Sequence, residues 1–159
     1  MTHKVLLSLG SSIEPRKTYL DIAVSALESL EETSSVRVSP IHETEPMGAA
    51  QNPFLNMAVT LAVSDLTPHE FLQQALVIEA SLGRTRTVHW GDRTIDIDII
   101  LWGESIVRDE TLTIPHPFMA ERSFVLAPAT QIAPDWMDPV SGLSISQLLQ
   151  RLEAVPCNV

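Results

Sequence analysis

The chain has 159 residues, of which 45% are hydrophobic and 19% are charged. This length suits one compact domain, residues 1–159, and the composition excludes an intrinsically disordered chain. The net charge of -10 disfavours binding to nucleic acid or to an acidic membrane, because the average surface field repels phosphate groups.

The first half of the chain predicts a strand, a helix and two further strands. Val5 to Leu9 is an apolar run typical of a buried strand. Pro15 to Glu32 carries apolar residues at helical spacing after a starting proline. Val36 to Ser39, which could extend to His42, and Met57 to Val63 both alternate and therefore predict strands.

The second half predicts a helix and a strand before it becomes rich in proline. Thr67 to Glu79 has the pattern of a helix, which Gly83 ends. Thr94 to Trp102 alternates with a period of two and predicts a strand, followed by a short return strand at Ser105 to Val107. The remaining chain is expected to form a loop-rich C-terminal extension that closes with a helix at Ser144 to Leu152.

The order of these elements is βαββαβ. Such an order is typical of an antiparallel sheet with both helices packed on one face. No repeat or low-complexity linker divides the chain. The sequence therefore predicts a single α+β domain.

Two aspartates lie on the strand predicted from Thr94. Because side chains alternate across a strand, Asp96 and Asp98 point to one face about 7 Å apart, while Ile97 points to the other. Neighbouring carboxylates repel each other unless a cation lies between them, and their oxygen atoms suit Mg²⁺. The same spacing also fits the solvent-facing half of an amphipathic strand, so both interpretations remain open.

A basic loop leads directly into this acidic strand and carries Arg84, Arg86, His89, Trp90 and Arg93. Arginine binds phosphate oxygens in pairs, so a polyphosphate held between metal and guanidinium groups would satisfy both sets of charges. A surface network of arginine–aspartate ion pairs is the alternative. The chain has no P-loop or Rossmann glycine motif and no nucleophile elbow, which argues against those folds and against a covalent enzyme.

The segment Gly83 to Asp98 resembles the signature of the 6-hydroxymethyl-7,8-dihydropterin pyrophosphokinases. It has Gly-Arg-x-Arg followed by His-Trp-Gly-Asp-Arg-Thr-Ile-Asp-Ile-Asp. The resemblance continues in order at Gly10-Ser11, Thr44 to Gly48, Phe54 to Asn56, Ile78-Glu79, Leu112 to His116 and Arg122 to Phe124. It implies a ferredoxin-like fold and an enzyme of folate biosynthesis, which transfers pyrophosphate from Mg-ATP to the hydroxymethyl group of a dihydropterin and releases AMP.

The resemblance also implies roles for individual residues. Asp96 and Asp98 would hold two Mg²⁺ ions, with Arg84 and Arg93 as further catalytic residues that clamp the phosphates. The residues implied in binding ATP, the co-substrate, are Glu79, Arg84, Trp90, Arg93, Thr113, His116 and Arg122. The residues implied in binding the pterin are Thr44, Phe54, Asn56 and Phe124, of which the two phenylalanines would stack on the bicyclic ring.

Several positions depart from the usual pattern of this family. Ser12 stands where asparagine is typical, and Glu45 and Asp92 stand where proline is common. His89 replaces a frequent arginine, and Pro117 replaces a tyrosine found in some members. The aspartate pair and both matching arginines are retained, so the assignment to the family does not depend on these positions.

The implied partners are small molecules, namely ATP and 6-hydroxymethyl-7,8-dihydropterin. We expect no nucleic acid, membrane or obligate protein partner. Two other classes of protein fit parts of the sequence. A ferredoxin-like regulatory module would bind a pterin or a nucleotide with little or no catalysis, and a metal-dependent nuclease would use the same carboxylates but is disfavoured by the acidic surface.

Features that would direct the chain to a membrane or an oxidising compartment are absent from the sequence. The single cysteine, Cys157, cannot form an intrachain disulfide bond. The apolar run Val5 to Leu9 is too short for the core of a signal peptide, and no apolar stretch reaches membrane-spanning length. These features predict a cytoplasmic protein.

Overall fold

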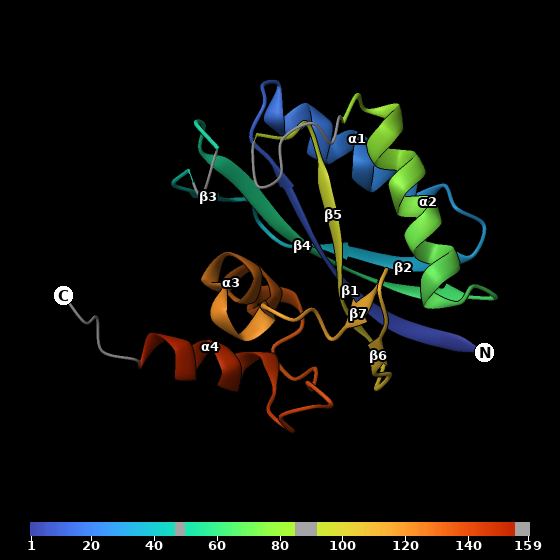
Figure 1. Cartoon of the computed structure of the whole chain (residues 1–159), viewed down its shortest axis with the longest axis vertical. Helices are drawn as coiled ribbons and strands as arrows, with labels where there is room; N and C mark the ends of the chain where they lie inside the picture. Colours follow the sequence, from blue (N-terminus) through green and yellow to red (C-terminus); the bar gives the residue numbers. More distant parts are fainter. Residues whose placement is uncertain (47–49, 85–91, 155–159) are drawn as a thin grey trace.

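A computed structural model describes residues 1–46, 50–84 and 92–154, which form an antiparallel sheet with helices on both faces (Figure 1). The strand order across the sheet is β2-β4-β1-β5, and a short β3 also pairs with β4. These strands are β1 (Thr2–Ser11), β2 (Thr33–Val38), β3 (His42–Thr44), β4 (Phe54–Ser64) and β5 (Asp96–Trp102). A separate two-stranded sheet consists of β6 (Val107–Arg108) and β7 (Thr113–Ile114).

The helices divide between the two faces of the main sheet (Figure 1). One face is covered by α1 (Arg16–Glu28) and α2 (Pro68–Ser81). The other is covered by α3 (Ser123–Ile132) and, beyond it, α4 (Ile145–Glu153), with the short 3-10 helix η1 (Met119–Glu121) leading into α3. Within the described ranges, no helix combines the length and the apolar character that crossing a membrane requires.

The predicted order β1-α1-β2-β4-α2-β5 is confirmed, and so is the predicted final helix, which begins after Ser144 as α4. The helix predicted over Pro15 to Glu32 extends four residues too far at its C-terminal end, because α1 ends at Glu28. The Thr33 hydroxyl lies 2.6 Å from the Leu27 carbonyl oxygen and 2.9 Å from that of Leu30, so it satisfies acceptors that the helix end leaves open.

The short return strand predicted at Ser105 to Val107 is wrong in its extent and its partner. Val107 begins β6, which pairs with β7 rather than with β5. After β5 the Gly103 amide donates to the Lys4 carbonyl oxygen at 2.7 Å, with Gly103 in the left-handed region at φ 53°. The chain therefore turns away from the main sheet at this glycine.

The expectation of loops alone before the final helix is also wrong, because α3 occupies residues 123–132 and contains Pro128. A proline inside a helix removes one hydrogen bond, which is why the sequence argues against a helix here. Burial outweighs this loss, since Val125, Leu126 and Ala129 lie against the sheet in a shared apolar cluster. The local pattern could not reveal that contact.

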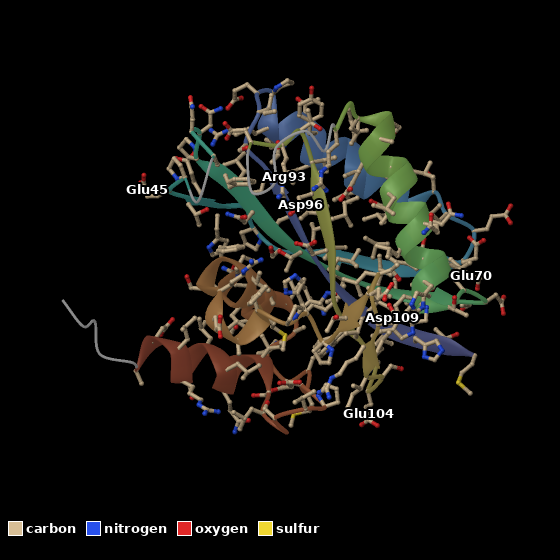
Figure 2. All side chains as sticks on the ribbon, in the orientation of Figure 1. Glu45, Glu70, Arg93, Asp96, Glu104 and Asp109 are labelled. Carbon is tan, nitrogen blue, oxygen red and sulfur yellow. The ribbon has the colours of Figure 1, made fainter. Side chains whose placement is uncertain are left out.

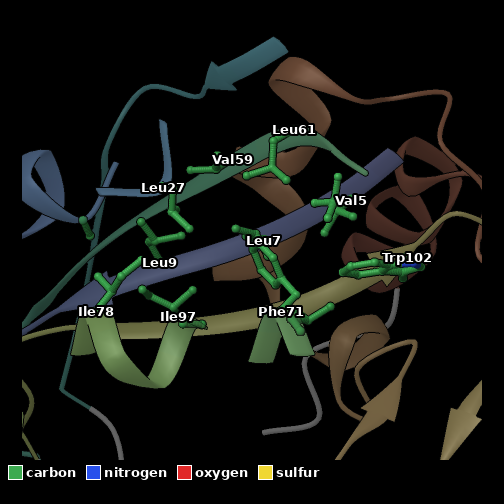
Figure 3. Close-up of a cluster of buried hydrophobic side chains, with 14 of the residues drawn as sticks. Val5, Leu7, Leu9, Leu27, Val59, Leu61, Phe71, Ile78, Ile97 and Trp102 are labelled. Atoms are coloured by element: carbon green, nitrogen blue, oxygen red, sulfur yellow. The ribbon is translucent and has the colours of Figure 1, made fainter. Parts of the chain in front are cut away.

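Strand β1 is buried on both sides, which explains why it is an unbroken apolar run. Val5, Leu7 and Leu9 face α1 and α2, where Phe71 of α2 packs edge-on against Trp102 of β5 with 5.7 Å between ring centroids (Figure 3). The side chains between them face α3 and α4, and Leu6 belongs to that second cluster. The sheet thus separates two apolar cores.

Farther along the strands, the face that carries Leu6 becomes small and polar. The register pairs Gly10 of β1 with Asn56 of β4 on one side and with Asp96 of β5 on the other. Ser8 pairs with Ala58 and Asp98 in the same way. Residues predicted to bind metal and residues predicted to bind pterin therefore lie on one face of three adjacent strands, at one end of the sheet.

Candidate active site

The predicted alternation of β5 is confirmed. Ile97 and Ile99 are buried in the first apolar core, while Asp96 and Asp98 are half-buried on the opposite side. Their register opposite Gly10 and Ser8 places both carboxylates on the polar end of the second face. The aspartates therefore share one surface, as metal binding requires.

The two arginines predicted to clamp phosphate both contact Asp96. Arg84 Nη1 donates to Asp96 Oδ1 at 2.9 Å, and Arg93 Nη1 donates to Asp96 Oδ2 at 3.0 Å. Figure 2 shows Arg93 and Asp96 side by side where β5 begins. Each carboxylate oxygen thus accepts from a different guanidinium group, and this contact joins the basic loop to the acidic strand.

Glu79 is buried where α2 meets β5, with 3% of its surface exposed. One carboxylate oxygen, Oε2, accepts from the Ile97 amide at 2.8 Å, and the other, Oε1, lies 2.7 Å from Arg84 Nη1. Because β5 is an edge strand, its outward amide needs a partner, and Glu79 supplies one. Glu79 therefore fixes the edge of the sheet and holds Arg84 against Asp96.

Asp98 lies in an environment that disfavours its charged form. Burial raises its pKa well above the usual value for an aspartate, and the charges of Asp96 and Glu79 raise this pKa further. Arg122 and Arg93 act in the opposite direction without cancelling the effect. A carboxylate in this position gains from a nearby cation.

His116 lies beside β5, because its backbone amide donates to the Ile100 carbonyl oxygen at 3.0 Å. Burial lowers the pKa of His116 to about 4, and the Arg122 charge contributes to this shift. The ring is therefore neutral at pH 7. Since Nδ1 accepts from the Phe118 amide at 3.2 Å, the ring proton is assigned to Nε2, which makes that nitrogen a hydrogen-bond donor.

Arg122 lies between two aromatic rings. Its guanidinium carbon is 5.1 Å from the centre of the Phe118 ring and 5.5 Å from that of Phe124. Cation–π contacts of this kind restrain the long side chain. Phe118 is not among the predicted site residues, because an isolated phenylalanine in a proline-rich stretch offers no signal that it would stack on an arginine.

The residues predicted to bind the pterin are partly brought together. Phe54 and Asn56 lie on the same face of β4, and the Asn56 side-chain amide donates to Thr44 Oγ1 of β3 at 2.8 Å. Both approach Gly10, where an added Cβ atom would lie 3.4 Å from Asn56 Oδ1 and 3.4 Å from the Phe54 ring. Phe124 comes from α3, which covers this face and contacts β3 and β4.

Thr113, which is predicted to bind ATP, is not joined to this cluster. Thr113 lies on β7 opposite Arg108, beside the part of β5 that is farther from Asp96 (Figure 1). Trp90 lies outside the residues that the structure describes, as do Arg86 and His89. Their predicted roles stay predictions.

Ser12 makes contacts that its sequence position did not suggest. Its hydroxyl accepts from the Arg93 amide at 2.9 Å, and its own amide donates to the Arg93 carbonyl oxygen at 2.9 Å. The end of β1 is thereby attached to the residue that carries one of the side chains predicted to clamp phosphate. Only the tertiary structure brings these positions together, because they are separated by about half the chain.

Comparison with known proteins assigns the chain to a family. The sequence profile described as 7,8-dihydro-6-hydroxymethylpterin-pyrophosphokinase (HPPK) matches residues 6–134. Proteins named 2-amino-4-hydroxy-6-hydroxymethyldihydropteridine pyrophosphokinase are similar over most of their length. That of Bacillus subtilis is 46% identical over 83% of this chain and 79% of its own. That of Methylorubrum extorquens is 40% identical, with 94% of each chain covered.

Solved structures with the same fold are much more distant in sequence. The crystal structure of an HPPK-DHPS in complex with substrates has a TM-score of 0.75 and 12% identity, and covers 95% of this chain. The Plasmodium falciparum HPPK-DHPS with pteroate has a TM-score of 0.74 and 13% identity. This chain spans 43% and 42% of those two chains, so it corresponds to less than half of each.

The fold and the matched sequences place the chain among the pyrophosphokinases. More particularly, it belongs to the 7,8-dihydro-6-hydroxymethylpterin-pyrophosphokinase family, since the profile and the relatives cover most of its length. The resemblance found in the Gly83 to Asp98 segment is thereby confirmed.

Proposed function

We propose that this chain transfers the pyrophosphate group of Mg-ATP to the hydroxymethyl group of 6-hydroxymethyl-7,8-dihydropterin, releasing AMP, as a step of folate biosynthesis. The observation that carries this function is the joining of Asp96 to Arg84 and Arg93, beside Asp98, in a chain of this family. Such a set of charges suits a polyphosphate with its cation. The activity is that of an ATP-dependent diphosphotransferase.

Asp96 and Asp98 are the residues that would hold Mg²⁺, with two ions expected. The chemistry of the donors fits, because both offer oxygen ligands on one face and desolvation raises the pKa of Asp98. Among the described residues, no group of three or more His, Cys, Asp or Glu is arranged to hold a metal alone. Phosphate oxygens and water would therefore complete the coordination, as is usual for Mg²⁺ bound with a nucleotide.

Arg84 and Arg93 balance the charge of Asp96 when no cation is bound. Magnesium on Asp96 would compete with them for the same carboxylate oxygens, leaving their N–H groups for the phosphates. Arg84 is suited to this, because its Nε atom is buried without a hydrogen-bond partner among the described residues. A phosphate oxygen would satisfy this donor.

The reaction forms a bond between the substrate hydroxymethyl oxygen and the β-phosphorus, and it breaks the bond between that phosphorus and the oxygen bridging to the α-phosphate. The electron pair of the broken bond leaves with AMP. Bound Mg²⁺ would neutralise charge on the transferred group and make the hydroxyl easier to deprotonate. The protein contributes orientation, with Arg84 and Arg93 holding the phosphates in line with the hydroxyl.

His116 and Arg122 would contribute further donors to the triphosphate. The neutral His116 ring donates through Nε2, and the Phe118 and Phe124 rings restrain the Arg122 guanidinium group. Glu79 would act close to the nucleotide by holding Arg84. Trp90 and Thr113 remain proposed ATP contacts on the basis of the resemblance.

The pterin would lie against Phe54 and Asn56, with Thr44 holding the Asn56 amide and Phe124 stacking from α3. Adjacent strands are separated by about 4.8 Å, so Asn56 and Asp96 are roughly 10 Å apart across Gly10. Because Gly10 has no side chain, the surface between Asn56 and Asp96 is left open for a substrate; we call this surface the floor of the site. This distance suits a substrate whose ring edge lies at Asn56 and whose hydroxymethyl group points towards Asp96.

Three further proposals concern the fold, the domain organisation and the location of the chain. The strand order β2-β4-β1-β5 with two crossing helices supports a ferredoxin-like description of the sheet. Residues 1–159 would act as one catalytic domain. The single cysteine and the substrates support a cytoplasmic location.

The test is AMP formation by the purified chain. AMP should appear only when ATP, Mg²⁺ and 6-hydroxymethyl-7,8-dihydropterin are all present, and a chelator should stop it. AMP formation without the dihydropterin, or none with all three, would contradict the proposal. The second result would favour a regulatory module, which calorimetry would reveal as pterin or nucleotide binding without turnover.

A further inference from the structure

Asp92 makes a contact that the proposed catalytic roles do not use. Its Oδ2 atom accepts from the Gln51 amide at 3.0 Å, and its Oδ1 atom accepts from the Asn52 amide at 3.1 Å. Burial acts to raise the pKa of Asp92, but these two amides and the Ser12 hydroxyl lower it below the usual value. One carboxylate thus holds two consecutive backbone amides from a segment 40 residues away in sequence.

The segment that Asp92 holds leads directly into the proposed pterin site. Asn52 is followed by Pro53 and then by Phe54, where β4 begins. Phe54 and Asn56 are the two residues of β4 proposed to contact the pterin. The position of residues 51–53 therefore sets how the Phe54 end of the strand approaches the substrate.

The other neighbour of Asp92 is Arg93, which belongs to the proposed phosphate clamp. The backbone of Arg93 is bonded to Ser12 in both directions, with 2.9 Å for each hydrogen bond, and its guanidinium group is bonded to Asp96. Arg93 is therefore fixed to the end of β1 and to the start of β5, and Asp92 directly precedes it in the chain. The Asp92 carboxylate connects this position to the start of β4.

A second contact, from Arg16 at the start of α1, holds the same segment. Arg16 Nη1 donates to the Pro53 carbonyl oxygen at 3.2 Å and lies 3.0 Å from Glu43 Oε2. Residues 51–53 therefore have two amides bonded to Asp92 and one carbonyl oxygen bonded to Arg16. A backbone segment bonded at three successive residues has little freedom to shift relative to Arg93.

We propose that Asp92 is a positioning residue that sets the distance between the pterin contacts of β4 and the phosphate clamp at Arg93. It acts through Gln51 and Asn52 and does not touch the substrate. The inference rests on the proposed function, because it concerns the alignment of the hydroxymethyl group with the phosphate. The sheet itself does not need Asp92, since β4 is paired with β1 from Leu55 to Ser64 and Phe54 is paired with Thr44 of β3.

The test compares Asp92→Ala and Asp92→Asn with the wild-type chain. Alanine removes both acceptors, whereas asparagine keeps one oxygen and turns a donor towards the other amide. We expect the KM for the dihydropterin to rise about tenfold for alanine and less for asparagine, as loss of charge-assisted hydrogen bonds implies. The Kd for an ATP analogue should stay within about twofold, since Arg93 keeps its bonds to Ser12 and Asp96.

Amide exchange supplies a readout that does not depend on activity. The Gln51 and Asn52 amides should exchange faster in Asp92→Ala, while the Arg93 amide should not change. Asp135→Asn is the matched control, because Asp135 is exposed, lies on the α3–α4 connection and carries the same charge. Its kinetics and its exchange should equal those of the wild type.

Several outcomes would overturn the inference. If the wild type is active and the pterin KM of Asp92→Ala is unchanged, the positioning role of Asp92 is refuted while the proposed function stands. Equal weakening of pterin and ATP binding would also refute it, because that result indicates a general structural defect. If Asp92→Ala fails to fold, an unchanged pterin KM and unchanged exchange in Asp92→Asn would be decisive against it. A wild type that forms no AMP would reject the proposed function and this inference together.

Discussion

Replacing Glu79 tests how the candidate site is built into the sheet. Glu79→Ala would remove the acceptor of the Ile97 amide, 2.8 Å away, and the ion pair with Arg84, 2.7 Å away. Both partners are buried, with 4% of the Glu79 side chain and 9% of the Arg84 side chain exposed. Removing Glu79 leaves the Ile97 amide unsatisfied in the interior and leaves the buried Arg84 charge paired with Asp96 alone.

The expected loss of unfolding free energy for Glu79→Ala is about 3 to 5 kcal/mol. For a chain of this size each kcal/mol lowers the melting temperature by about 2 to 4 °C, so the variant should melt roughly 10 °C below the wild type. Glu79→Gln keeps an oxygen that can accept from the Ile97 amide. It replaces the charged oxygen that faces Arg84 with an uncharged amide nitrogen, so the ion pair is lost. It should cost about 1.5 to 3 kcal/mol, the range for a hydrogen bond to a charged group.

Urea unfolding followed by circular dichroism measures these losses directly. Glu28→Ala is the control, because Glu28 is an exposed glutamate at the end of α1 and its replacement should change stability by less than about 0.5 kcal/mol. If Glu79→Ala were as stable as Glu28→Ala, the argument that Glu79 supports the edge of the sheet would be refuted.

Three further predictions concern the polar face. Asp98→Asn should melt higher than the wild type at pH 7 without metal, while AMP formation falls at least about a hundredfold. The sign follows because the raised pKa of Asp98 means that the folded wild type binds a proton more tightly than the unfolded chain, so it loses stability as the pH rises through that pKa. A lower melting temperature would contradict this. Gly10→Ala should raise the dihydropterin KM about tenfold with little change in stability, because its methyl group would lie 3.4 Å from Asn56 Oδ1. An unaltered KM would count against the proposal that the pterin lies over Gly10. The His116 ring should titrate in NMR near pH 4 rather than near 6.5, and the stability that its neutral form provides should be lost as the pH falls from about 6.5 to 4. A midpoint near 6.5 would show that the ring is not desolvated.

The two arginine contacts of Asp96 also bear on how the enzyme would bind its substrates. Two guanidinium groups occupy the carboxylate oxygens that the proposed Mg²⁺ would need. Binding of Mg-ATP would exchange these contacts for metal–carboxylate and arginine–phosphate contacts. Asp96 is thereby paired within the fold, since an unpaired charge at this partly buried position would destabilise the structure.

Much of the site could be predicted from the chain because it depends on local periodicity. Alternation along β5 is enough to put Asp96 and Asp98 on one face and Ile97 on the other, and the structure confirms it. The strands, the first two helices and the final helix follow from apolar spacing and from capping residues such as Thr67 and Ser144. These features need only the geometry of a helix or a strand.

Other features depend on contacts between distant segments, which local patterns do not encode. Helix α3 forms in spite of Pro128 because the sheet offers its apolar side chains a surface to bury. The attachment of Asp92 to Gln51 and Asn52, and of Phe118 to Arg122, likewise depends on how the connections cross the end of the sheet. Sequence periodicity determined which side chains share the polar face of the sheet, whereas tertiary contacts alone decided which residues hold those side chains in place, since burial and hydrogen bonding act between segments far apart in the chain.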